Sequence, residues 1–228
     1  MKNVIYVINA SSRTDTGITG DLARSLAWAA ADAMPQVNCV TLEDGPCGIS
    51  TARDSDDAAP AVLRFIEREA KKPETAGFVV ACFSDPGVFA ARGLTGKPVA
   101  GIGEAGFLAA LSMGEMVGTI GVAAGNGAKS MRLARHIGVA QRIAGHRGLG
   151  LDYGQLQDPA LVTARLIAAG KALRDEEGAG SLLFAGAGLA RYVEPLEQAV
   201  GLPVVDPTQA AFGIVLAQVM QKAYARHG

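Results

Sequence analysis

The sequence predicts an α/β protein of two pseudo-symmetric lobes, each a mainly parallel sheet flanked by helices. Short β-branched runs alternate with amphipathic stretches along nearly all of the 228 residues. This alternation is typical of parallel sheets covered by helices. The composition points the same way, since 29 glycines and a single tryptophan suit many tight strand-to-helix turns. A weak internal repeat, described below, indicates two lobes.

The expected strands are short apolar runs rich in valine and isoleucine. The first, residues 4–8 (VIYVI), is apolar throughout, as expected of a buried strand in a parallel sheet. The third, residues 78–81 (FVVA), ends directly before Cys82. In chain order we expect strands at residues 4–8, 37–42, 78–81, 98–101, 117–122, 146–149, 181–185 and 204–205.

The expected helices carry apolar residues at helical spacing. Leu22 and Leu26 fall on one face of residues 20–34, and a similar apolar face recurs in residues 58–72. Proline and glycine near the beginning of residues 86–92 indicate a helix start there. In chain order we expect helices at residues 20–34, 58–72, 86–92, 105–113, 128–137, 159–176, 190–200 and 207–225.

Two corresponding strand ends suggest two similar lobes. One predicted strand leads into Cys82 and a later one leads into Gly186, at similar places in two successive strand–helix series. We expect the first lobe to contain residues 1–96 and 208–228, and the second to contain residues 97–207. Ligands of open α/β sheets bind outside the carboxyl ends of the strands, so we expect the active site between the lobes.

Composition and charge argue against several classes of function. The formal net charge is −1 with acids and bases interspersed, so we expect neither a nucleic-acid nor a membrane partner. No apolar run reaches membrane-spanning length, and the run near the N-terminus is too short for a signal sequence. Three cysteines form an odd set without paired metal-ligand spacing. We therefore expect a soluble cytoplasmic protein without a metal site.

Cys82 is the most informative residue for function. It follows an apolar strand and precedes an expected helix start, where unpaired N–H groups and the helix dipole favour a thiolate. Such a thiol could carry a proton or act as a nucleophile, while the N–H groups of Phe83 and Ser84 hold an oxyanion. The alternative is an inert thiol, because free cysteine is among the most buried residue types. We adopt that alternative for Cys39 and Cys47.

Small polar residues follow other predicted strands. Asn9, Ser11 and Ser12 end the first strand and offer amide and hydroxyl groups to an anion, although serine there also suits a helix cap. Asn126 lies in a glycine-rich turn that could approach a ligand by its backbone or could simply be a turn. Asp206 precedes the last expected helix, and we interpret it as the cap of that helix.

A dinucleotide-binding pattern, G-x-G-x-x-G, occurs at residues 101–106 (GIGEAG), after a strand and before a helix. The pattern also requires an acidic residue about 20 positions later, at the end of the next strand, to hold the ribose. That strand ends in residues 123–126 (AAGN), which contain no carboxylate. We therefore interpret residues 101–106 as a tight turn and expect no nicotinamide cofactor.

Six segments of the chain carry a further pattern. They are residues 45–49 (GPCGI), 81–87 (ACFSDPG), 98–105 (PVAGIGEA), 134–138 (ARHIG), 201–206 (GLPVVD) and 209–211 (QAA). Together they resemble the aspartate/glutamate/hydantoin racemase superfamily, and its hydantoin racemase branch most closely. The resemblance covers nearly the whole chain, and the second and third segments are fairly specific.

The resemblance implies two pseudo-symmetric lobes, no cofactor, and two cysteines that flank the α-carbon of the substrate. One cysteine takes the proton, and the other returns it from the opposite face. The first corresponds to Cys82. The second would lie in a Gly-Cys-Ala-Gly turn, and Gly186 occupies its place here. The Asn-Pro-Asn-Thr pattern of the first strand is also altered, to NASS at residues 9–12.

One thiol in place of two leaves three interpretations. A racemase or epimerase acting on a hydantoin or amino-acid derivative fits the motifs, but it needs water or another group on the second face. A decarboxylase for a disubstituted malonate fits the single thiol, as in arylmalonate decarboxylase, a relative whose thiol occupies the other of the two positions. The third interpretation is a ligand-binding protein that kept the cleft and lost turnover.

All three interpretations predict a small anionic or imide-like ligand. We expect Cys82 to be the acid/base. The expected ligand contacts are Asn9, Ser11, Ser12, Phe83, Ser84, Asn126, Gly186 and Ala187. By resemblance, we also expect a homo-oligomer.

Overall fold

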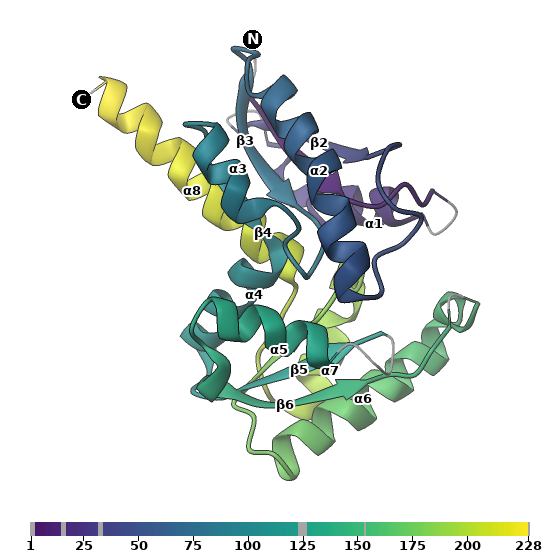
Figure 1. Cartoon of the computed structure of the whole chain (residues 1–228). Helices are drawn as coiled ribbons and strands as arrows, with labels where there is room; N and C mark the ends of the chain where they lie inside the picture. The colour runs from purple at the N-terminus through teal and green to yellow at the C-terminus, as the bar shows by residue number, and fades with distance from the viewer. Residues whose placement is uncertain (1–2, 15–16, 32–33, 123–126, 153, 228) are drawn as a thin grey trace. The chain divides into compact units, whose positions relative to one another are not determined.

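The computed structural model contains two compact units, each built on one parallel sheet (Figure 1). It describes residues 3–14, 17–31, 34–122, 127–152 and 154–227. The first unit comprises Met1–Ile102 and Thr208–Gly228, and the second comprises Gly103–Pro207. The first unit extends beyond the boundary expected after residue 96, because strand β4 (Val99–Gly101) pairs with β3 (Thr75–Val80) of the first sheet.

The sheet of the first unit has the strand order β2-β1-β3-β4, and all its pairings are parallel. Its remaining strands are β1 (Val4–Asn9) and β2 (Gln36–Thr41). Its helices are α1 (Ile18–Ser25), the single turn η1 (Ala27–Ala29), α2 (Ala52–Glu69), α3 (Val88–Leu94) and α8 (Pro207–His227). The order reverses between β1 and β3, and ligands of open α/β sheets bind at the carboxyl ends of strands at such a switch point.

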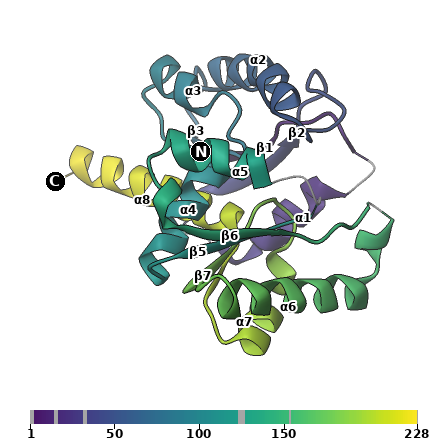
Figure 2. The same cartoon turned by 60° about the horizontal axis from the view of Figure 1, so that its bottom comes forward.

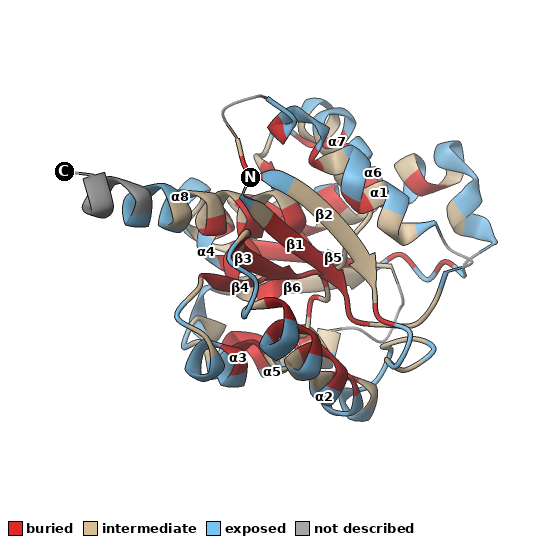
Figure 3. Ribbon diagram, turned by 90° about the horizontal axis from the view of Figure 1, so that it is seen from above, coloured by how far each residue is buried: buried red, intermediate tan, exposed pale blue. Residues whose placement is uncertain are grey.

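Helices cover both faces of this sheet. On one face, α2 and α3 pack against alternate residues of the central strands, and Tyr6 lies edge-on to Phe65 with ring centroids 5.3 Å apart. On the other face lie α1 and α8, and Trp28 of η1 meets Phe212 of α8 edge-to-face at 5.7 Å. Figure 3 shows buried residues concentrated on β1 and β3. Helices therefore hold the central strands β1 and β3 from both sides.

The second unit repeats this arrangement. Its sheet has the order β6-β5-β7-β8, again with parallel pairings. Its strands are β5 (Val117–Gly121), β6 (Ile143–Gly148), β7 (Ser181–Phe184) and β8 (Val204–Val205). Its helices are α4 (Ile102–Met113), α5 (Gly127–His136), η2 (Ala140–Arg142), η3 (Gln155–Gln157), α6 (Pro159–Asp175), η4 (Ala190–Tyr192) and α7 (Val193–Val200). In Figure 2, α6 and α7 lie on one side of the sheet and α4 and α5 on the other.

Counted along each unit, both sheets have the order second, first, third, fourth strand. The predicted fold class, two similar parallel sheets flanked by helices, is therefore confirmed. Within the described ranges, no helix is both long enough and apolar enough to cross a membrane.

Two helices of the first unit differ from their predicted ends. Helix α2 begins at Ala52, before the predicted residue 58, because a capping box starts it. The Thr51 hydroxyl accepts the Asp54 N–H at 3.1 Å, and the Asp54 carboxylate accepts the Thr51 N–H at 2.8 Å. The polar run that follows Thr51 hides this start from hydrophobic periodicity. Helix α1 is shorter than predicted and ends at Ser25.

Loss of the α2 capping box will destabilise the protein. We expect Thr51→Ala to lower the free energy of unfolding by about 1 kcal/mol, because the Asp54 N–H loses its partner. Urea unfolding followed by circular dichroism measures this. Ser50→Ala is the matched control, since Ser50 bonds Asp54 through its backbone N–H. Equal unfolding free energies for the two variants would contradict the assignment.

Candidate active site

The carboxyl ends of β1 and β3 form a polar edge of the first sheet. The two strands are neighbours, and the N–H of Ala81 donates to the carbonyl oxygen of Ile8 over 2.8 Å. Asn9, the last residue of β1, therefore lies beside the turn that carries Cys82. This edge is the switch point of the strand order, where α/β folds bind their ligands.

Cys82 lies in a tight turn between β3 and α3. The N–H of Asp85 donates to the carbonyl oxygen of Cys82 at 2.9 Å and closes the turn. The Cys82 Sγ lies 3.3 Å from the Ser84 Oγ, and both residues are partly exposed. The Phe83 side chain is buried, so its backbone is the part that we expect to face a ligand. The turn thus combines a partly exposed cysteine, which also packs against the core of the first unit, with a hydroxyl and main-chain groups.

Helix α3 starts later than predicted. Its first residue is Val88, and its N-cap, Gly87, has a left-handed φ of 75°. Pro86, the expected first helical residue, belongs to the preceding turn. Cys82 therefore lies outside the first turn of α3. The expectation that a helix N-terminus polarises the thiol is wrong, and the turn residues set the surroundings of Cys82 instead.

The two other thiols lie in different surroundings. Cys39 is on β2, and burial raises its pKa to about 11. Cys47 is exposed in the loop after β2. Of the three cysteines, Cys82 is the one that joins a partly exposed thiol to a strand end at the switch point.

Asn9 orders the loop that follows β1. Its side chain is buried, and its Oδ1 accepts the Ser11 N–H at 3.2 Å and the Ser11 hydroxyl at 3.0 Å. Its Nδ2 donates to the Thr41 Oγ1 at 3.3 Å. The Ser12 N–H in turn donates to the Pro46 carbonyl oxygen at 2.9 Å. The Asn9 amide is thus engaged inside the protein, and the serine side chains, both partly exposed, are better placed to meet a ligand.

Gly186 has the same place in the second sheet as Cys82 has in the first. Strands β5 and β7 pair as β1 and β3 do, and the Ala185 N–H donates to the Ile120 carbonyl oxygen over 2.7 Å. Ala185 therefore corresponds to Ala81, and the next residue in each turn is Gly186 or Cys82. Gly186 is partly exposed, and a Cβ there would meet no atom within 4 Å. A larger side chain fits at this position.

The predicted site residues fall into two groups. Those at the carboxyl edge of the first sheet are Asn9, Ser11, Ser12, Cys82, Phe83 and Ser84. Those at the matching edge of the second sheet are Gly186 and Ala187. Asn126 lies outside the described residues.

Asp85 is the residue at this edge that the sequence reasoning missed. It is 3% exposed and has a φ of 51°, the one left-handed φ of a non-glycine residue in the described part of the chain. Aspartate directly before Pro-Gly is a turn pattern and was the available signal.

The surroundings of His146, a histidine of the second sheet, do not indicate a catalytic role. His146 is on β6, with its Nδ1 2.9 Å from the Thr119 Oγ1. Burial lowers the pKa of His146, so the ring stays neutral near neutral pH. We interpret it as a structural residue. Among the described residues, no three or more His, Cys, Asp or Glu side chains form a group that could hold a metal ion.

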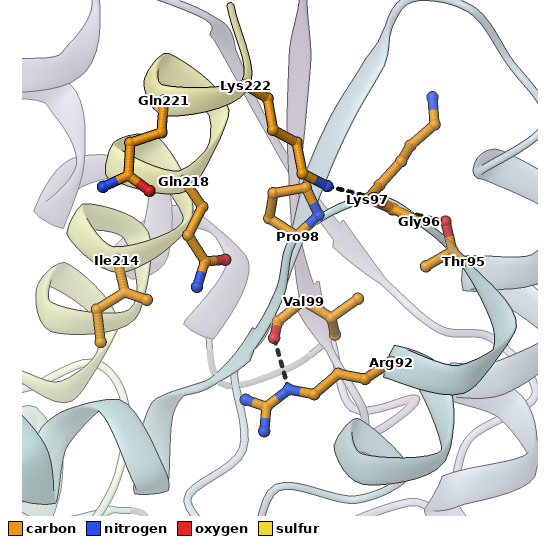
Figure 4. Close-up of a pocket in the computed structure, with 10 residues that line it drawn as sticks. All are labelled: Arg92, Thr95, Gly96, Lys97, Pro98, Val99, Ile214, Gln218, Gln221 and Lys222. Carbon is orange, nitrogen blue, oxygen red and sulfur yellow. Dashed lines mark hydrogen bonds between the residues drawn. The ribbon is translucent and has the colours of Figure 1, made fainter. Parts of the chain in front are cut away.

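A pocket of about 330 Å³ lies elsewhere on the first unit (Figure 4). It is lined by Arg92, Thr95, Gly96, Lys97, Pro98, Val99, Ile214, Gln218, Gln221 and Lys222. Pro98 directly precedes β4, so the pocket is at the amino-terminal end of that strand, whereas Cys82 follows the carboxyl end of β3. The Arg92 Nε donates to the Val99 carbonyl oxygen at 3.1 Å, and Lys222 donates to that of Gly96. The pocket contains none of the predicted site residues.

Comparison with known proteins identifies the family. A sequence profile described as Asp/Glu/Hydantoin racemase matches residues 5–215. The chain belongs to the Asp/Glu/hydantoin racemase family. Among its relatives, the hydantoin racemase of Pseudomonas sp. (strain NS671) is 30% identical over 198 residues, which are 85% of this chain and 77% of that protein.

Solved structures share the fold. Allantoin racemase from Klebsiella pneumoniae matches with a TM-score of 0.86 at 24% identity, over 97% of this chain and 89% of that one. Unliganded arylmalonate decarboxylase matches with a TM-score of 0.66 at 16% identity, over 96% and 93% of the two chains. The predicted superfamily is therefore confirmed, and both racemases and a decarboxylase are built on this architecture.

Cys47 and Cys39 are expected to differ in reactivity, because the first is exposed and the second is partly buried. At about pH 8 we expect iodoacetamide to alkylate Cys47 much faster than Cys39, because a pKa of about 11 keeps the Cys39 thiol protonated and only the thiolate reacts. Raising the pH towards 11 increases the Cys39 rate. Both cysteines lie on the tryptic peptide of residues 25–53, so tandem mass spectrometry assigns the label to each site from fragment ions. Equal rates for the two cysteines at about pH 8 in the folded protein would contradict the raised pKa of Cys39.

Proposed function

We propose that the protein moves a proton at the α-carbon of a hydantoin, an amino-acid derivative or a related carbon acid, without a cofactor and with Cys82 as acid/base. The observation that carries this proposal is the Cys82 turn, a partly exposed thiol 3.3 Å from a hydroxyl at the switch point of the first sheet. The relative of Pseudomonas sp., a hydantoin racemase, supports the substrate class.

The proton transfer uses the groups of this turn. The Cys82 thiolate takes the α-proton, and the electron pair of the C–H bond moves into the adjacent carbonyl to form an enolate. The Ser84 hydroxyl and the N–H groups of the turn donate to the enolate oxygen as its charge grows. Return of a proton to the other face of the planar carbon gives the opposite enantiomer.

The second proton has a different source in this protein. The position that corresponds to the second family cysteine is Gly186, which carries no acid or base. The space around Gly186 is open, so a water molecule can take the place of the missing thiol. We expect inversion to be slower than exchange of the proton on the Cys82 side, because water is the weaker acid.

A second candidate is decarboxylation of a disubstituted malonate, and the glycine at residue 186 favours it. Loss of CO2 breaks a carbon–carbon bond and leaves its electron pair in the enolate. A single donor, the Cys82 thiol, then protonates one face of the carbon. Arylmalonate decarboxylase shares the fold, which is consistent with this chemistry.

One experiment separates the candidates. The protein is incubated in D2O with single-enantiomer hydantoins and amino acids, and separately with arylmalonates. Proton NMR follows α-deuteration, polarimetry follows optical rotation, and CO2 is measured. We expect α-deuteration with loss of rotation. Release of CO2 with one product enantiomer would establish the decarboxylase instead, and inactivity on every substrate would contradict both.

Cys82 is expected to be essential to turnover. Cys82→Ser should lower the rate of α-deuteration by about 100-fold or more, because general acid–base catalysis contributes on that scale and a hydroxyl is a much weaker acid. Cys47→Ser, which alters an exposed thiol, is the matched control and should keep the wild-type rate. Full activity of Cys82→Ser would remove Cys82 from the mechanism.

Restoring a thiol at residue 186 should speed inversion. Gly186→Cys places an acid/base where the family has its second cysteine, and the open space there accommodates the side chain. We expect the rate of racemisation to rise by about 100-fold relative to Gly186→Ala, which fits the same space without a thiol. Chiral chromatography of the product measures the rate. Equal rates for the cysteine and alanine variants would refute the assigned correspondence.

A further inference from the structure

We propose that Asp85 is a positioning residue for Cys82, because its carboxylate rests on Gly101 at the end of β4 and so fixes the turn that carries the thiol. The inference rests on the proposed function of Cys82. Asp85 acts through the turn, and we assign it no contact with substrate.

Asp85 combines an uncommon backbone conformation with burial. Its φ of 51° is left-handed, a region that residues other than glycine adopt uncommonly, with Asn and Asp the main exceptions. The residue is also only 3% exposed. Uncommon backbone conformations of this kind cluster at functional sites, where the surrounding structure maintains them. Asp85 stands three residues after Cys82.

The Asp85 carboxyl group lies against the backbone of Gly101. A Cβ at Gly101 would overlap the carboxyl group of Asp85, so only glycine leaves room for it. Gly101 pairs with Val80, the last residue of β3. The turn therefore folds back over the end of its own strand and contacts the neighbouring strand. This accounts for the first glycine of residues 101–106, a segment that passes from β4 directly into α4 and forms no separate turn.

The turn is consequently held at both ends. At its start, the Ala81 N–H bonds the Ile8 carbonyl oxygen of β1 at 2.8 Å. At its end, the Asp85 carboxylate lies against β4, and the Asp85 N–H bonds the Cys82 carbonyl oxygen at 2.9 Å. Release of the second anchor would let the thiol direction vary. A displacement of about 1 Å is enough to slow a catalysed reaction by about 100-fold.

The second unit supplies an independent comparison. Asp206 follows β8 and precedes α8, as Gly101 ends β4 and precedes α4, and the pairings of β8 with β7 and of β4 with β3 correspond. Asp206 is buried, and Leu189 takes the place of Asp85 in the turn after β7. Each unit thus has a buried carboxylate at this strand end. In the first unit this carboxylate belongs to Asp85, in the turn that carries the thiol. In the second unit it belongs to Asp206, which follows β8.

The test uses a double-mutant cycle between Asp85 and Gly101. We expect Asp85→Gly to lower kcat for α-deuteration by about 10- to 100-fold with little change in KM, because the thiol is misplaced while ligand contacts persist. Gly101→Ala should have a similar effect by displacing the carboxylate. The double variant Asp85→Gly/Gly101→Ala should be no slower than Gly101→Ala alone. Asp44→Asn, which alters an exposed carboxylate on the loop after β2, is the control.

A purely structural role of Asp85 would lower the thermal midpoint of Asp85→Gly together with its kcat. The positioning role predicts that Asp85→Gly keeps its thermal midpoint while it loses kcat, because glycine accepts a left-handed φ freely. Asp85→Asn, which keeps the shape of the side chain and tolerates the same backbone, should retain most of the wild-type rate. A wild-type kcat for Asp85→Gly, or fully additive losses in the double variant, would overturn the proposal.

Alkylation separates this inference from the proposed function. The iodoacetamide rate of Cys82, normalised to Cys47 in the same sample, should change several-fold in Asp85→Gly and in Gly101→Ala. Such a change in a protein without turnover would sustain the positioning role and reject the proposed function. An unchanged alkylation rate would overturn the positioning role whether or not the protein turns over substrate.

Discussion

Two equivalent main-chain hydrogen bonds determine where the turns with the proposed site residues leave their sheets. The Ala81 N–H bonds Ile8 in the first sheet at 2.8 Å, and the Ala185 N–H bonds Ile120 in the second at 2.7 Å. A shift of one residue in either pairing would turn every following side chain to the other face of its sheet. The buried residues of β1, β3, β5 and β7 set the strand register. This register therefore places Cys82 beside the end of β1 and Gly186 beside the end of β5.

The two units keep one topology but differ in the groups at their polar edges. The first has a thiol, a hydroxyl and a buried carboxylate close together in one turn, whereas the second has Gly186 and Ala187. The proposed acid/base, Cys82, thus lies in the first unit. In the proposed reactions a single thiol reaches one face of a planar carbanion, so inversion takes its second proton from water, while decarboxylation needs only one donor. The same asymmetry underlies both candidate reactions.

Sequence reasoning predicted the parts of this picture that depend on local pattern. Apolar runs located the strands, and the strand end at Cys82 followed from them. The start of α2 was missed because a capping box at Thr51, and not an apolar face, begins it. The start of α3 was misplaced because Pro86 belongs to a turn that Asp85 holds against Gly101, a contact between residues far apart in the chain. No spacing of residue types reveals such a contact.

The central claim is that one thiol serves one face of the reacting carbon. It is tested most directly by comparing, for each enantiomer of a turned-over hydantoin separately, the rate of α-deuteration in D2O with the rate of inversion. The account predicts that one enantiomer exchanges its α-proton with retention faster than it inverts, because Cys82 both takes and returns that proton. Equal rates of exchange for the two enantiomers, each accompanied by inversion, would show two matched bases and contradict it.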